Sequence, residues 1–106
     1  MTSPLDLELH DSLIKELNID FRRKIVTLMI DFYPTDSTKI RSPLELTFSN
    51  VESMSGLYDF YSLDKNSFAG NISYWHPGDT TYIYLSDGCI SIKSKNVTCK
   101  IFPPQN

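Results

Sequence analysis

The sequence predicts an all-β domain, mainly antiparallel, built as a sandwich or partly open barrel of about six to eight strands with at most one short helix. Apolar side chains recur at every second position in several segments, which is the period of a half-buried strand. An Asp87-Gly88 pair between two such segments is a strong cue for a hairpin. At 106 residues the chain has the length of one domain with its own core, so residues 1–106 form a single β-rich domain.

The first predicted hairpin covers residues 13–33. One face of it carries Leu13, Leu17, Ile19, Phe21, Val26, Leu28, Ile30 and Phe32, with Lys15 interrupting the pattern. We expect Phe21 to pair with Val26, because this register puts the large apolar side chains on one side. The link Arg22-Arg23-Lys24 holds no Gly or Asn, which favours a loop built on a type I turn over a tight primed turn.

The middle of the chain is less regular. Residues 33–43 are polar, with a proline near each end, and predict a long hairpin loop. A third strand follows, because Leu44, Leu46 and Phe48 alternate with polar residues. Residues 50–60 read as strand or irregular structure, and residues 61–70 have room for one helical turn.

The second predicted hairpin covers residues 80–93. A turn at Asp87-Gly88 gives a register that pairs Ser86 with Cys89, Leu85 with Ile90 and Ile83 with Ile92. Tyr82 and Tyr84 then lie on the face opposite the isoleucines.

Two further features flank this hairpin. Ile72 and Tyr74 suggest one more strand before it, with a turn at residues 76–79. After Lys93 the apolar positions change from even to odd numbers, which one straight strand cannot keep on a single face. We therefore expect a turn or a bulge at residues 94–96.

Composition narrows the classes of function. The formal net charge of −3 argues against a nucleic-acid binder and fits a protein that meets a basic partner. The start "MTSPLDLELHDS" has neither the cationic beginning nor the apolar run of a signal peptide, and no apolar stretch reaches membrane-spanning length. Two cysteines without an export signal indicate free thiols in a reducing compartment. We therefore expect a cytoplasmic protein that binds neither nucleic acid nor membrane.

His10-Asp11 is the strongest candidate for a metal or catalytic pair. In an alternating segment, neighbouring side chains point to opposite faces, so the two should not converge on one ion. His10 and His76 would share a site with Asp79 only if the fold brought both segments together. A small metal-dependent hydrolase using His10, Asp11 and His76 is therefore an alternative and not the first hypothesis.

Other catalytic patterns are missing from the sequence. Cys89 and Cys99 fall on predicted strands, and neither has an adjacent His to lower a thiol pKa. There is no G-x-S-x-G motif, and none of the four glycines lies in a phosphate-binding loop pattern. We expect a protein without catalytic residues, metal or cofactor.

Aromatic residues are concentrated in one part of the chain. Five of the six tyrosines and the single tryptophan fall between residues 58 and 84: Tyr58, Tyr61, Tyr74, Trp75, Tyr82 and Tyr84. Exposed, they would form a surface typical of protein–protein contacts; buried, they would form a second small core with phenolic groups at its edge. Together with Asp11 and Glu16 of the acidic N-terminal segment, these aromatic residues are the candidate binding residues.

Short motifs give a resemblance over residues 9–93. The opening "LHDSLIKELNID", an alternating hairpin, and then "V…G…D" and "GNI" resemble small, mostly uncharacterised bacterial single-domain proteins. Some of these are grouped with the immunity proteins of polymorphic toxin systems. The resemblance implies a cytoplasmic, antitoxin-like binder with no catalytic residues, of a kind that often carries acidic patches against basic toxins.

These observations favour a non-catalytic protein-binding module, with an immunity-type inhibitor of a toxin as its narrower form. The second hypothesis is the metal-dependent hydrolase. The third is a self-associating structural subunit, because exposed edge strands would allow a homodimer.

Overall fold

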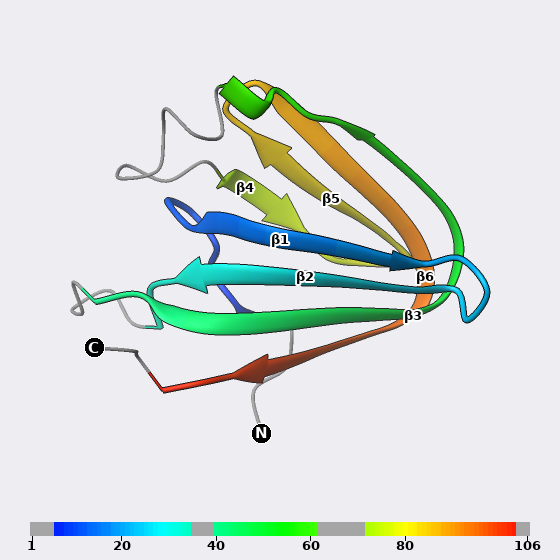
Figure 1. Ribbon diagram of the computed structural model, residues 1–106. Coiled ribbons are helices and arrows are strands. Elements are labelled where there is room, and N and C mark those ends of the chain that lie inside the picture. The colour runs from blue at the N-terminus through cyan, green and yellow to red at the C-terminus, as the bar shows by residue number, and fades with distance from the viewer. Residues whose placement is uncertain (1–5, 35–39, 62–71, 104–106) are drawn as a thin grey trace.

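The computed structural model of the protein describes residues 6–34, 40–61 and 72–103, which form one six-stranded antiparallel sheet (Figure 1). The strands are β1 (Leu13–Asp20), β2 (Ile25–Phe32), β3 (Ser42–Leu57), β4 (Ile72–His76), β5 (Thr80–Leu85) and β6 (Gly88–Ile101). Their order across the sheet is β1-β2-β3-β6-β5-β4. The all-β, antiparallel prediction is confirmed: the sheet curls on itself without closing into a barrel.

The curl comes from the two long strands, β3 with 16 residues and β6 with 14. The first half of β3 pairs with β2 and with the end of β6, whereas its second half pairs with the start of β6. Both strands therefore run through both halves of the sheet, which brings the start of β1 close to the start of β4 (Figure 1). The predicted strand at residues 44–49 forms, and β3 continues through the ambiguous segment as far as Leu57.

One core fills the space inside the curl. Its buried members are Leu9, Val26, Leu28, Ile30, Phe32, Leu44, Leu46, Phe48, Ile72, Trp75, Ile83, Leu85, Ile90 and Ile92. In β2 and β5 the buried residues fall at every second position, as the alternation in the sequence predicts. Each fully buried aliphatic or Phe side chain contributes roughly 1.5–3 kcal/mol, so this one face supplies the main driving force for the fold.

The first hairpin forms with a register two residues away from the predicted one. Ile19, and not Phe21, stands opposite Val26. The link is longer than expected because Phe21 belongs to the turn, which ends with Lys24 at a φ of 59°. From Glu16 to Asp20 a shift of two residues keeps each side chain on its predicted face, although the predicted partners are wrong. Before the irregularity between Ile14 and Glu16 the phase differs, and Ile14, not Leu13 of the predicted apolar face, stands opposite Ile30.

The second hairpin shows the same two-residue shift. Leu85 pairs with Gly88, and Ser86-Asp87 form the turn in place of Asp87-Gly88. Among the non-glycine residues that the structure describes, positive φ angles occur at Asp11, Lys24 and Asn50 only. Ser86 and Asp87 therefore do not form the type I′ turn that Asp-Gly pairs favour. The predicted strand and turn before this hairpin are present, as β4 and residues 77–79.

The sheet bends at the middle of β3. Asn50 has a φ of 53°, and the register with β6 shifts between Val51 and Ser53. Of the turn or bulge predicted at residues 94–96, no turn forms, because β6 is continuous there. A register irregularity does occur opposite Ser94, but its extra residue is on β3. The inward-facing positions of β6 still change from even to odd residue numbers, as predicted. Bulges and bends are the features by which strands pass from one half of a folded sheet to the other.

The segment before β1 joins the two rims of the sheet. The Asp11 amide donates to the Ile72 carbonyl at 2.9 Å, and the Ile72 amide donates to the Ser12 carbonyl at 3.1 Å. The Trp75 indole donates its Nε1–H to the Leu7 carbonyl at 2.9 Å. We call residues 7–12 the strap, because they connect the start of β1 to β4, the strand at the far end of the sheet order.

Two predicted features fall largely outside the described residues: the helical turn at 61–70, apart from Tyr61, and the centre of the loop at 33–43. Within the described part of the chain, no helix has the length and apolar character needed to cross a bilayer.

Candidate functional site

Three tyrosines form a stacked row on the outer face of the β4–β5 hairpin. Tyr74 lies across from Tyr84, with ring centroids 6.1 Å apart, and Tyr82 follows at 6.3 Å from Tyr84. His76 stacks on Tyr74, with ring centroids 6.4 Å apart, and stands opposite Tyr82, so the four rings form two cross-strand pairs. Tyr74 is 53% exposed, Tyr82 41% and Tyr84 44%. We call Tyr74, His76, Tyr82 and Tyr84 the tyrosine face.

The alternation of β5 explains why these rings face outward. Ile83 and Leu85 point into the core, so Tyr82 and Tyr84 point away from it. Cross-strand pairing then brings Tyr74 beside Tyr84, where offset aromatic rings attract each other. The row is therefore held in place by the sheet beneath it.

Trp75 is the predicted binding residue that the structure places in the core. It is 5% exposed, and its indole is bonded to the strap. A register irregularity between Ile72 and Tyr74 is responsible, because it lets Ile72 and Trp75 both point inward although they are three positions apart. Trp75 therefore anchors the strap and does not contribute to the exposed surface.

Tyr58 and Tyr61 lie apart from the tyrosine face, at and beyond the end of β3. Tyr61 is exposed. The ring of Tyr58 lies across Gly56, where any side chain would overlap the phenol. Burial raises the pKa of Tyr58 above its ordinary value of 10.0. Tyr58 is also part of the wall of a pocket.

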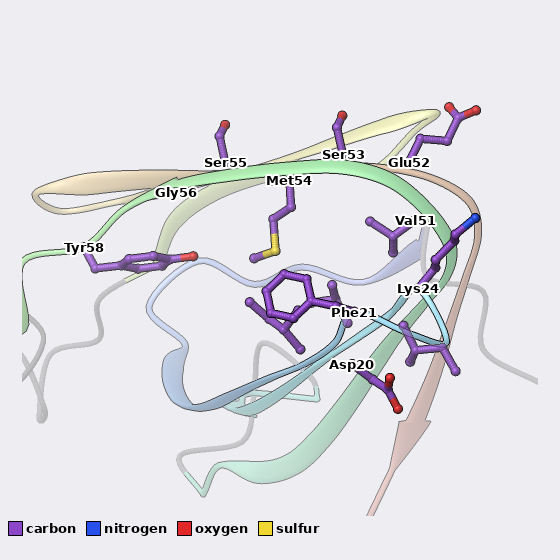
Figure 2. A pocket seen from close by; sticks show the side chains of 13 residues that line it. Asp20, Phe21, Lys24, Val51, Glu52, Ser53, Met54, Ser55, Gly56 and Tyr58 are labelled. Carbon is purple, nitrogen blue, oxygen red and sulfur yellow. The ribbon is translucent and has the colours of Figure 1, made fainter.

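That pocket, which we call the groove, encloses about 570 Å³ between the tip of the β1–β2 hairpin and the second half of β3. Figure 2 shows Phe21, Met54 and Tyr58 pointing into it. Its walls are formed by Ile19, Asp20, Phe21, Lys24, Ile25, Val26, Val51, Glu52, Ser53, Met54, Ser55, Gly56 and Tyr58. Sequence reasoning missed the groove, because the expected register placed Phe21 within a strand and not at a turn.

His10 and Asp11 lie in a turn before β1, and the expectation that they point apart is wrong. Asp11 has a φ of 64°, so the period-two argument does not apply to it. His10 Nε2 lies 3.5 Å from an Asp11 carboxylate oxygen, and His10 Nδ1 lies 2.9 Å from the Ser73 carbonyl. The bond to Ser73, and then the Asp11 carboxylate, raise the pKa of His10 above 6.5. Both contacts favour a protonated ring that donates from both nitrogens.

The structure separates the other polar candidates. His76 Nδ1 lies 3.5 Å from the Tyr74 hydroxyl, so it belongs to the tyrosine face and not to the His10 pair. Among the residues that the structure describes, no three His, Cys, Asp or Glu side chains are grouped closely enough to hold a metal ion. Asp11 is bonded to Ile72, two residues before Tyr74, whereas Glu16 is exposed on β1 opposite Met29.

Cys89 and Cys99 form no disulfide, as the sequence predicts. Cys89 is exposed, and burial raises the pKa of the half-buried Cys99. Comparisons of the chain with protein-family models, with curated proteins and with solved structures return no match. The geometry thus defines a small antiparallel β protein with an aromatic outer face at one place and an apolar groove at another.

Proposed function

We propose that the protein is a non-catalytic protein-binding module whose tyrosine face contacts the partner. The supporting observation is a group of three exposed tyrosines on a paired hairpin, in which Tyr84 stacks on both Tyr74 and Tyr82. Tyrosine is enriched among the residues that dominate binding energy, because it offers a large apolar ring and a polar tip. Rings that are already ordered lose little freedom when a partner covers them.

The surroundings of the row suit a protein partner. β5 is paired on both sides, with β4 and β6, so this part of the sheet is rigid. Asp11 and His10, at the junction of the strap and β4, add charged groups near the row. An apolar centre with a polar rim is the usual anatomy of a protein interface.

The narrower proposal is an immunity-type inhibitor that binds a toxin in the cytoplasm. It rests on the resemblance of residues 9–93 to small bacterial proteins of that group, and on the net charge of −3, which favours a basic partner. Inhibition by binding needs no catalytic residue, which agrees with the expectation from the sequence.

The test begins with identification of a partner, from the products of adjacent genes and from affinity capture, followed by calorimetry with the purified pair. Tyr82→Ala/Tyr84→Ala should weaken binding by about tenfold or more, because interface tyrosines often contribute about 2 kcal/mol. Phe60→Ala is the matched control, since it removes an exposed ring that belongs neither to the tyrosine face nor to the groove, and it should leave the dissociation constant within about threefold.

Two results would count against the proposal. Unchanged affinity in the tyrosine double variant would remove the tyrosine face as the binding surface. For the narrower form, co-expression with the partner should restore the growth of cells that the partner poisons, and a partner without toxicity would refute the inhibitor role.

A further inference from the structure

The second half of β3 has an open edge. Pairing of β3 with β2 ends at Phe48, whereas pairing with β6 continues to Leu57. The Val51 amide still donates to the Lys24 carbonyl at 3.0 Å. Beyond that bond, within the described part of the chain, residues 52–57 have no partner strand on their outer side, whereas residues 53–57 pair with β6 on the other side. Their outward N–H and C=O groups form a ready template for another strand.

This edge forms one wall of the groove. Consecutive residues from Val51 to Gly56 line the groove, although neighbouring side chains of a strand point to opposite faces. Figure 2 shows Ser53 and Ser55 on one side of the ribbon and Met54 on the other. The main chain itself therefore borders the groove, as it does where a strand is missing from a sheet.

The opposite wall is apolar. Phe21 is 84% exposed at the hairpin turn, and Ile19 is 43% exposed. Figure 2 shows Phe21 beneath Met54, with Tyr58 at one end of the groove. An extended chain laid along the β3 edge would direct alternate side chains onto this wall.

The groove wall carries one cation that makes no ion pair with a described residue, although the chain has a net charge of −3. Asp20 is paired with Arg23, whose Nε lies 3.9 Å from the carboxylate. Glu52 is paired with Lys93 at 3.7 Å. Among the described residues, this leaves Lys24 of the groove wall without a carboxylate at ion-pair distance. An acidic group on a ligand would complement Lys24.

We propose that the groove binds an extended, apolar and acidic peptide segment of a partner protein, which pairs with residues 52–57 of β3 as an added strand. Its alternate apolar side chains contact Phe21, Met54 and Tyr58, and an acidic side chain lies near Lys24. Strand addition is an established mode of peptide recognition, in which main-chain bonds give affinity and pockets give specificity. A small apolar molecule would leave the edge N–H and C=O groups unpaired, which is why a peptide is favoured. The proposal concerns a second surface and does not depend on the tyrosine face.

The test uses a phage-displayed dodecapeptide library, selected on the full-length protein and depleted on Lys24→Glu. Enriched peptides should alternate apolar residues and carry Asp or Glu. One enriched peptide, synthesised with blocked ends, should bind at least about tenfold more weakly to Lys24→Glu and to Met54→Asp. Tyr82→Ala/Tyr84→Ala should bind it as the wild type does, which separates this site from the tyrosine face.

The decisive control changes the peptide and leaves the protein intact. A peptide of the same sequence that is N-methylated at alternate amides keeps its side chains but cannot complete the strand ladder, so its binding should fall at least about tenfold. Hydrogen exchange should slow at residues 52–57 when the unmodified peptide binds.

Three results would overturn the proposal. The first is a selection that enriches no peptide whose binding depends on Lys24. The second concerns two N-methylated peptides, each carrying methyl groups on one of the two sets of alternate amides: if both bind as tightly as the unmodified peptide, no strand is added. The third is occupation of the groove by something else. Decanoate binding that Met54→Asp abolishes, with no peptide bound, would indicate a small-molecule site. A concentration-dependent dimer that the same variant disrupts would show that a second copy fills the edge.

Discussion

His10 shows how two neighbouring groups set the charge of one side chain. Asp11→Asn should lower the pKa of His10 towards 6.5, because it removes the carboxylate 3.5 Å from Nε2 while the bond to Ser73 stays. Imidazole proton shifts followed over pH by NMR, in a His76→Gln background that leaves one histidine, measure this directly. An unchanged titration would show that the carboxylate does not act on the ring.

The same shift has a consequence for stability, whose sign follows from linkage. The pKa of His10 is raised in the folded state, so its contribution is fully present below 6.5 and is lost as the pH rises through the raised value. His10→Gln should therefore flatten the dependence of unfolding free energy on pH in that window, as measured by urea denaturation.

Gly88 shows how closely two strands approach at the start of β6. A Cβ added at Gly88 would overlap the carbonyl oxygen of Leu57, which is main chain and cannot turn aside. Gly88→Ala should therefore destabilise the protein by about 1–3 kcal/mol in urea unfolding. Gly78→Ala is the matched control, because its Cβ would meet Thr80 at an ordinary 3.5 Å, and it should change stability by less than about 0.5 kcal/mol. Equal stabilities of the two variants would contradict the close approach.

At the scale of elements, the sequence predicts the faces of the strands but not their partners. The face of a residue depends on local alternation, so Val26 and Ile83 were placed on the core side correctly. The register depends on how each turn closes. Lys24 has a φ of 59°, and lysine is not a residue type that predicts a positive φ. Next to their turns, both hairpins therefore shift by two residues, an even number that the alternation of apolar and polar residues cannot detect.

The candidate site divides in the same way. The outward position of Tyr82 and Tyr84 follows from the isoleucines beside them, so this part of the tyrosine face was predictable. The inward position of Trp75 was not, because a local irregularity in β4 changes the phase between Ile72 and Tyr74. The groove was not predictable either, because it forms where β3 continues beyond the end of its pairing with β2. How far one strand extends past its neighbour cannot be predicted from local sequence.

At the scale of the whole molecule, the ends of the sheet order are protected against self-pairing. The β4 rim is covered in part by the strap, through the bonds of Asp11 and Ser12 to Ile72. The β1 rim has a register irregularity between Ile14 and Glu16, and it carries the exposed Lys15 within it. Bulges and lysines are common devices that keep edge strands from pairing with other chains.

We therefore expect a monomer of 12.2 kDa in sedimentation velocity at about 10 μM, a concentration at which weak edge contacts dissociate. A stable dimer at this concentration would favour the third hypothesis, a self-associating subunit. Repeating the measurement with Lys15→Val would show whether the β1 edge is the protected one. If Lys15 prevents pairing through β1, its removal should produce a dimer.

The bond between Trp75 and Leu7 gives the molecule a built-in optical reporter. The chain has a single tryptophan, so its fluorescence comes from one known place, at the joint between the strap and β4. Release of the strap would expose the indole to water and shift its emission to the red while the ladder between β3 and β6 stays intact. Comparing that colour change with circular dichroism during denaturation would tell whether the strap detaches before the rest of the sheet melts.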